Sequence, residues 1–405
     1  MTPAGSPTAP TVGSAPTART APSIIGWSHS AFGRRPESLQ ELMGQAAREA
    51  VAHAGLELTE VDALHVGVFN NGLYPQGFEA ALPAVEIPEF ELVPAHRHES
   101  ACATGSAAVF AAYDAVAAGR AKVALVIGAE HMTHVPGHDV GNVLLSASYR
   151  EEEEHHKSFA GVFGELARQY TDRYGDPSES LARIAAKNHG NGAHNPLAHM
   201  QKDLGFEFCH TVSEKNPYVA EPLRRTDCSL VSDGAAALVI AAPEVAVSAP
   251  QAVGWRGQGN ANDALPISRR DPLELRGASA AMDQALRAAG IRLTDLDLLE
   301  THDCFTIAEL LQYEAFGLAA RGEGGSVIDS GFTAIDGALP VNPSGGLKSK
   351  GHPIGATGVS MHVMAARQLV GDASGLQVPG AELAGVFNMG GVAVSNFASV
   401  LERVR

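Results

Sequence analysis

The sequence predicts an α/β fold built from two similar lobes. Three observations support this prediction. Helix-like and strand-like segments alternate along the chain, two segments of the first half recur in the same order in the second half, and a long stretch between them has no counterpart. The chain has 405 residues, of which 45% are hydrophobic and 18% are charged, so it can bury a large core.

The first half opens with a short apolar run at Ile24 and Ile25 that predicts a strand. Residues 39–54 then place apolar side chains at helical spacing, and Gly55 follows where a helix C-cap is expected. The later pattern predicts, in order, a strand over 63–69, an Ala-rich helix over 102–118, a buried strand over 122–127, and a turn with a buried strand within 227–240. Helices between strands favour a mainly parallel sheet.

The second half repeats two of these segments. Residues 50–66 (AVAHAGLELTEVDALHV) align with residues 285–301 (ALRAAGIRLTDLDLLET), and residues 102–119 align with residues 355–372. The strand KVALVIG likewise aligns with ELAGVFN. Two matches in the same order favour a duplication. Because a duplicated fold brings equivalent helix N-termini to a shared axis, we expect Cys102 to face the segment GHPIGATG.

Composition divides the chain into further parts. Residues 1–22 are rich in Pro, Ala, Thr, Ser and Gly and predict a disordered tail. Residues 132–226 lack a counterpart in the second half and predict an inserted loop domain. We therefore expect an N-terminal lobe over 23–250, which contains the insertion, and a C-terminal lobe over 251–405.

Charge and cysteine content exclude several classes of protein. The chain has 29 Lys and Arg against 45 Asp and Glu, a formal net charge of −16, which argues against binding to nucleic acid or to an anionic membrane. No stretch approaches the ~20 apolar residues of a membrane span. Four cysteines without a CxxC spacing suggest neither a disulfide framework nor a metal site, and we expect a reduced, cytoplasmic protein.

Cys102 is the first candidate catalytic residue. It lies in HESACATGSAAVF, where an extended lead-in meets the start of the predicted helix. The N–H groups and the dipole at such a position lower the pKa of a thiol and make it a nucleophile, and the Cys102 N–H can hold a substrate oxygen. A small buried hydrophobic residue is the alternative, and it is the commoner fate of a cysteine.

Two histidines and a second cysteine are further candidates. His352 lies in NPSGGLKSKGHPIGATG and is expected to be a base for a thiol or a donor to an anionic oxygen, although such a glycine-rich loop can also bind an anion. His302 and Cys304 lie in HDCF, directly after the apparent strand LDLLE. On an extended segment they share a face, so the second thiol can move a proton, and Asp303 is expected to point the other way as a structural partner. Core packing is the alternative for Cys304.

The last candidates lie at a strand end, in FNMGGVAVSNF. Asn388 is followed by Gly390 and Gly391, whose backbone N–H groups can form half of an oxyanion hole opposite Cys102. A glycine bulge is the alternative. The other reactive side chains are expected to be bystanders, namely the acidic and His-rich run at 151–156 on the surface, and Cys209 and Cys228 within the insertion.

Taken in this order, the motifs resemble those of the thiolase superfamily, and the resemblance covers nearly the whole chain beyond the tail. It rests on SACATGSAA, SDGAAALVI, HDCFT, NPSGGLKSKGHPIGATG and NMGG, and HDCF marks the sterol-carrier-protein branch. The resemblance implies a five-layered α-β-α-β-α fold with a loop domain over the active site. It also implies a homodimer or homotetramer that uses coenzyme A thioesters as substrates, with no further cofactor.

The resemblance also implies roles for the candidate residues. Cys102 matches the nucleophile that carries the acyl group, His352 matches the histidine that activates it, and His302 matches the histidine that shapes the other thioester-oxygen site. Typical thiolases carry an acid/base cysteine near the C-terminus, where this sequence has an asparagine, so Cys304 of HDCF inherits that role. Gly390 falls on the oxyanion-hole glycine of the family.

The expected protein is therefore an acyltransferase of the thiolase type. It would make or cleave the carbon–carbon bond of a 3-oxoacyl-CoA through a covalent acyl group on Cys102. Two alternatives stay open at this point. One is a thiolase-fold acyltransferase or retro-aldol lyase that works beside an OB-fold partner protein, and the other is a catalytically silent scaffold subunit.

Overall fold

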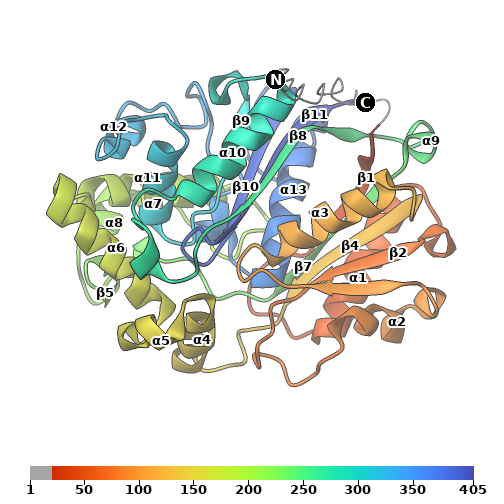
Figure 1. Cartoon of the computed structure of the whole chain (residues 1–405), viewed down its shortest axis with the longest axis horizontal. Coiled ribbons are helices and arrows are strands. Elements are labelled where there is room, and N and C mark those ends of the chain that lie inside the picture. The colour runs from red at the N-terminus through yellow and green to blue at the C-terminus, as the bar shows by residue number, and fades with distance from the viewer. Residues whose placement is uncertain (1–20) are drawn as a thin grey trace, which may run out of the picture.

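The computed structural model describes residues 21–405, so the tail expected over residues 1–22 lies almost entirely outside the described residues. The first half alternates between strand and helix (Figure 1). Its elements are β1 (Ser23–His29), α1 (Leu39–His53), β2 (Ala63–Gly67), α2 (Leu82–Glu86), β3 (Ala95–His98), α3 (Thr104–Ala117), β4 (Val123–Glu130), β7 (Gly234–Ala241) and α9 (Pro243–Ala246).

The second half repeats this alternation and ends in a hairpin. Its elements are β8 (Val253–Asn262), α10 (Arg276–Ala289), β9 (Leu298–Glu300), α11 (Thr306–Ala315), α12 (Gly324–Asp329), the π-helical turn η9 (Gly346–Lys350), α13 (Ile354–Val370), β10 (Leu383–Gly390) and β11 (Ser395–Arg403). Between residues 21 and 405, no helix is both long enough and apolar enough to cross a membrane.

The interval between β4 and β7 contains the insertion expected over 132–226. In Figure 1 its yellow and green helices lie to one side of the sheet. Its elements are α4 (Gly137–Leu144), α5 (Arg150–Glu153), α6 (Phe159–Tyr174), α7 (Ser178–Ala193), α8 (Gly205–His210) and the two-stranded ribbon β5 (Tyr218–Ala220) and β6 (Leu223–Arg224). The division into lobes at residue 250 stays a prediction.

Nine of the strands form one sheet in the order β3-β2-β4-β7-β1-β8-β11-β10-β9. The first-half and second-half strands meet only at β1 and β8, where Ser23 pairs with Gly254 and Ile24 with Val253. The expectation of a mainly parallel sheet is wrong. Only the pairs β2–β3, β2–β4 and β9–β10 are parallel. The connections between strands explain the antiparallel pairs. A tight turn joins β10 to β11, and β7 follows the insertion, so neither β11 nor β7 enters the sheet through the helical crossover that parallel neighbours need.

Helices cover both faces of this sheet and also fill the space between its two halves. Helix α1 packs on β1, β4 and β7, and α10 packs on β8 and β11. Helices α3 and α13 pack against each other in the middle, and α13 contacts β4 and β7 on one side and β10 on the other (Figure 1). The layers are therefore α1, the first half-sheet, α3 with α13, the second half-sheet and α10, which confirms the five-layered fold.

Equivalent residues of the two halves make the same hydrogen bonds, as a duplication requires. The Asp62 carboxylate accepts two backbone N–H groups at the start of β4 (2.8 and 3.0 Å). The Asp297 carboxylate accepts the corresponding pair at the start of β10 (2.8 and 2.8 Å). Gly55 and Gly290 follow α1 and α10 with φ of +72° and +67°, the left-handed conformation that ends a helix.

The first turns of α3 and α13 contact each other through glycines. A Cβ on Gly105 would lie 2.8 Å from the Gly355 oxygen and 2.8 Å from the Gly358 nitrogen, so the backbones can approach only because no side chain stands there. This contact brings Cys102, just before α3, next to the GHPIGATG segment. The expectation that the two segments face each other is confirmed.

Candidate active site

Four candidate residues from distant parts of the sequence lie together between the two halves. The Cys102 sulfur and one ring nitrogen each of His302 and His352 lie within 4.8 Å of one another. Cys304 lines the same cavity as Cys102 and His352. Cys102 comes from the turn between β3 and α3, His302 and Cys304 follow β9, and His352 precedes α13. The predicted convergence of two thiols and two imidazoles is confirmed.

Cys102 is buried, and its chemistry differs from the prediction. Only 6% of the residue is exposed. Burial raises the pKa of the Cys102 thiol to about 12, outweighing the backbone N–H groups of Cys102 and Gly391, which favour the thiolate. The carboxylates of Glu99 and Glu130 add to this rise. The expected low thiol pKa is wrong because the turn is covered, so the thiol needs a base that takes its proton.

His352 is arranged as that base. The Thr357 hydroxyl donates its hydrogen to the Pro353 carbonyl (2.9 Å), so the Thr357 oxygen accepts from His352 Nδ1, 2.6 Å away. The proton of the neutral ring is therefore on Nδ1, and Nε2 carries a lone pair. Burial, and then the Lys350 charge, lower the pKa of His352 to about 3. Nε2 is buried and makes no hydrogen bond to any described residue.

His302 holds its proton on the opposite nitrogen. The Asn388 side-chain amide donates one hydrogen to the Cys102 carbonyl (3.1 Å) and the other to His302 Nδ1 (2.8 Å). His302 Nδ1 is therefore an acceptor and Nε2 carries the hydrogen. Burial and the neighbouring His352 hold the pKa of His302 well below its usual range. Its Nε2–H has no acceptor among the described residues, so it is free to donate to a ligand.

The Cys102 sulfur and the ring nitrogens of His302 and His352 also have the spacing of metal ligands. A metal on His302 Nε2 would force the ring proton onto Nδ1, where the Asn388 amide already donates. The hydrogen bonds therefore favour one nitrogen that accepts a proton and one that donates a hydrogen bond.

Cys304 is close enough to Cys102 for their charges to interact. Burial raises the pKa of the Cys304 thiol well above its usual value, and negative charge on Cys102 raises it further. Cys304 is thus a neutral thiol beside a neutral thiol. Gln312 fixes the backbone of this loop, since its side chain donates to the His302 carbonyl (2.7 Å) and accepts from the His302 N–H (3.3 Å).

The strand end at 388–391 departs in detail from the expected oxyanion hole. Asn388 uses its amide to hold His302 and the Cys102 carbonyl. Within this strand end, the backbone N–H that faces the Cys102 sulfur is that of Gly391. Gly390 allows β10 to pass close to the Cys102 turn, because a Cβ there would overlap the Ser100 carbonyl. Its assignment as the oxyanion-hole residue stays a prediction.

The cavity beside the thiols has a volume of about 240 Å³. Cys228, expected to be a bystander, also lines it, while its sulfur donates to the Arg224 carbonyl (3.5 Å). Cys209 is buried beside α7 and does not line it. The remaining wall is mostly apolar and comes largely from the insertion and the HDCF loop, namely Met132, Val140, Leu144, Phe159, Val219, Leu230, Val231, Phe305 and Ile354.

Glu130 is a residue of the site that sequence analysis missed. It ends β4, and its carboxylate accepts the N–H groups of Phe69 (3.0 Å), Asn70 (3.0 Å) and Gly355 (2.9 Å). Burial raises the pKa of Glu130 to about 7 against the effect of these amides. The sequence signal for Glu130 was an acidic residue at the end of the otherwise apolar strand VALVIGAE.

Within the run at 151–156, Glu153 is buried, and the expectation that this run lies on the surface is wrong for that residue.

Comparison with known proteins gives consistent matches along the chain. Residues 23–244 match the family model "Thiolase, N-terminal domain", and residues 259–403 match "Thiolase C-terminal domain-like". An acetyl-CoA acetyltransferase of Methanothermobacter thermautotrophicus is 35% identical over 91% of this chain and 96% of its own length. Sterol carrier protein 2 of Bos taurus is 31% identical over 86% of this chain and 66% of its own length.

A similar fold occurs in the solved structure of the Ltp2-ChsH2(DUF35) aldolase. The TM-score is 0.77 at 23% sequence identity, and the match covers 96% of this chain and 99% of that chain.

Proposed function

This chain belongs to the thiolase family and is an acyltransferase, and from that premise we propose that it makes or cleaves the carbon–carbon bond of a 3-oxoacyl-CoA through an acyl group on Cys102. Two features support the proposal. One is the 35% identity to an acetyl-CoA acetyltransferase, and the other is the pair of opposed imidazoles at the Cys102 thiol.

In the first step, the Cys102 sulfur attacks the 3-oxo carbonyl, or a thioester carbonyl in the reverse direction. His352 Nε2 accepts the thiol proton as the S–C bond forms, because its lone pair makes no other hydrogen bond and His352 lies beside the Cys102 sulfur. The developing oxyanion is stabilised by the backbone N–H groups of Cys102 and Gly391, which face the sulfur. Since thiol and imidazole both start neutral, proton transfer accompanies the attack.

In the second step, the carbon–carbon bond breaks and the electron pair moves onto the departing thioester as an enolate. The His302 Nε2–H can donate to the enolate oxygen, and the Cys304 thiol can give its proton to the enolate carbon. A high thiol pKa fits this role because the thiol is protonated before the step. The thiol of coenzyme A then gives its proton to the Cys304 thiolate, and its sulfur attacks the acyl group on Cys102. The Cys102–acyl bond breaks, and the departing Cys102 sulfur takes back the proton held by His352.

One observation carries the proposal most directly, namely the hydrogen bonds of Thr357 and Asn388, which assign opposite tautomers to His352 and His302 at one buried thiol. The test is intact-mass analysis after mixing the protein with acetyl-CoA or acetoacetyl-CoA. We expect an acetyl adduct on Cys102 and none in Cys102→Ala. A folded wild-type protein that forms no adduct with either compound would refute the thiolase activity and favour the scaffold alternative.

The proposal also covers partners and compartment. Coenzyme A thioesters are the substrates, and we propose a homodimer or homotetramer in the cytoplasm, where four free cysteines stay reduced. The fold shared with the Ltp2-ChsH2(DUF35) aldolase supports one alternative, a lyase that works with an OB-fold partner. Light scattering of the purified chain tests the first expectation, and turnover of a 3-hydroxyacyl-CoA with an added partner tests the second.

A further inference from the structure

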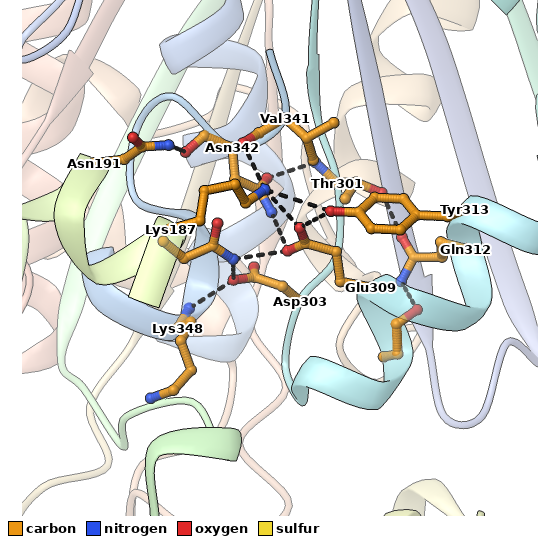
Figure 2. Close-up of polar contacts among 12 residues, drawn as sticks. Lys187, Asn191, Thr301, Asp303, Glu309, Gln312, Tyr313, Val341, Asn342 and Lys348 are labelled. Atoms are coloured by element: carbon orange, nitrogen blue, oxygen red, sulfur yellow. Dashed lines mark hydrogen bonds and ion pairs between the residues drawn. The ribbon is translucent and has the colours of Figure 1, made fainter. Parts of the chain in front are cut away.

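A buried cluster of polar side chains surrounds Asp303 and Glu309 (Figure 2). Its carboxylates are Asp303 and Glu309, its cation is Lys187, and its amides are Asn188 and Asn342. We call these five residues the carboxylate cluster. All except Lys187 are 0% exposed, and the Lys187 side chain is 8% exposed. None of the five lines the cavity described above.

Asp303 connects the two catalytic loops. It lies between His302 and Cys304 in sequence, and its carboxylate accepts the N–H groups of Leu347 (2.6 Å) and Lys348 (3.2 Å). Those two N–H groups belong to η9, which ends at Lys350, two residues before His352. Figure 2 shows the contact between Asp303 and Lys348. The approach is close, since a Cβ on Gly346 would overlap this carboxylate.

The insertion reaches the same carboxylate through α7. One hydrogen of the Asn188 amide goes to Asp303 Oδ2 (2.7 Å) and the other goes to Glu309 Oε2 (2.7 Å). Asn188 thus separates two carboxylates that would otherwise repel each other. Lys187, the preceding residue, neutralises Glu309 at 2.7 Å, and the Asn342 amide donates to Glu309 at 2.9 Å.

Neither catalytic loop is held by sheet hydrogen bonds over its whole length. Residues 301–305 follow the short β9 in irregular conformation. The segment before His352 has positive φ at Asn342 (+55°), Gly345 (+97°), Gly346 (+58°) and Gly351 (+112°). Backbone hydrogen bonds join the two segments at their start, where the Asn342 N–H donates to the Leu299 carbonyl (2.8 Å). Nearer the catalytic groups the Asp303 carboxylate joins them, through the N–H groups of Leu347 and Lys348.

We propose that Asp303 is a positioning residue that sets the loop of His302 and Cys304 against the loop of His352, and that Asn188 makes this geometry depend on the inserted segment. The inference rests on the proposed function. The insertion then does more than wall the cavity. It also holds the catalytic groups of both half-reactions in place.

The test compares variants of the full chain in two half-reactions. Asp303→Asn keeps the size of the side chain but turns an NH₂ toward backbone or Asn188 donors. We expect at least a tenfold slower acylation of Cys102 and at least a tenfold slower carbon–carbon step, with KM within twofold of wild type. Loss in both steps distinguishes this role from that of Cys304, whose substitution by Ala should slow only the carbon–carbon step.

Two further variants separate positioning from general destabilisation. Asn188→Ala should slow both steps, and the double variant should be no slower than Asp303→Asn, because the two residues act as one unit. Glu314→Gln is the matched control. It removes another buried carboxylate, one that accepts from Tyr170 (2.7 Å) and Gly324 (3.0 Å), and kcat should stay within twofold at a similar loss of Tm.

Three results would overturn the inference. They are a kcat within twofold of wild type in Asp303→Asn, a loss confined to the carbon–carbon step, or effects of the two substitutions that multiply. If Asp303→Asn does not fold, Asn188→Ala decides by the same half-reactions. Alkylation of Cys102 by iodoacetamide needs no acyl substrate and should slow at least fivefold in Asp303→Asn. It thus tests the positioning of His352 even if the wild type forms no acyl adduct.

Discussion

Replacing Thr357 by Val tests whether the proton position on His352 controls the nucleophile. Thr357 is buried, and its hydroxyl accepts from His352 Nδ1 at 2.6 Å while it donates to the Pro353 carbonyl. Valine has nearly the same shape but no oxygen, so the Nδ1–H loses its acceptor and the ring loses its reason to keep Nε2 unprotonated. The fold around α13 should survive because no volume is removed.

The size of the effect follows from the burial of this hydrogen bond. Removing one partner of a buried pair costs about 1–3 kcal/mol. If that cost falls on the reactive tautomer, acylation slows roughly 5- to 150-fold, since each 1.4 kcal/mol is about tenfold in rate. The assay is single-turnover acylation of Cys102 by acetyl-CoA, followed by rapid quench and intact-mass analysis, at a temperature well below the Tm of both proteins.

Thr357→Ser is the matched control, because it keeps the hydroxyl and removes only a methyl group. It should acylate within about threefold of wild type, a limit of less than 1 kcal/mol. A valine variant that acylates as fast as wild type would show that Thr357 does not set the tautomer of His352. A serine variant as slow as the valine variant would assign the loss to packing.

Three further predictions concern the other groups of the site. Asn388→Asp should reverse the His302 tautomer, since a carboxylate accepts a hydrogen bond from Nδ1–H. Loss of the Nε2–H should slow the carbon–carbon step roughly 10- to 100-fold by the same hydrogen-bond cost, measured as the rate of 3-oxoacyl-CoA cleavage. Unchanged cleavage would contradict the assigned role of the His302 Nε2–H. Cys304→Ala should still form the adduct on Cys102 from acetyl-CoA but stall before carbon–carbon bond formation, and normal turnover would remove Cys304 from the mechanism. Because the pKa of His352 is about 3, its imidazole is neutral and able to take the Cys102 proton throughout pH 7 to 9, and alkylation of Cys102 by iodoacetamide should change by less than about twofold over this range; a tenfold rise per pH unit would show that only free thiolate, formed from a thiol of pKa about 12, reacts and that His352 does not assist.

Much of the fold was predictable because it depends on local pattern and on internal repetition. The αL glycines after α1 and α10 and the paired Asp62 and Asp297 stand at the aligned positions of the two halves. The strand directions were not predictable in the same way. A strand that returns from a long insertion, such as β7, carries no sequence signal for the direction in which it enters the sheet.

The convergence of the site was also predictable, since it follows from equivalent helix N-termini in a duplicated fold. Its electrostatics were not. The helix start at Cys102 predicts a low thiol pKa, but burial of the thiol in the folded chain raises this pKa. The role of Asn388 was likewise not predictable from the sequence, because only the folded chain brings its amide between the Cys102 carbonyl and His302.

The buried, uncharged resting state has a consequence for catalysis. Desolvation disfavours both a thiolate on Cys102 and a proton on His352, so both groups are neutral before the attack. An acyl carbonyl changes this balance, because the negative charge that forms moves from sulfur to an oxygen faced by backbone N–H groups. Negative charge therefore develops on the substrate oxygen, where backbone N–H groups stabilise it. Before a substrate carbonyl binds, the Cys102 thiol stays protonated and is less reactive toward oxidants.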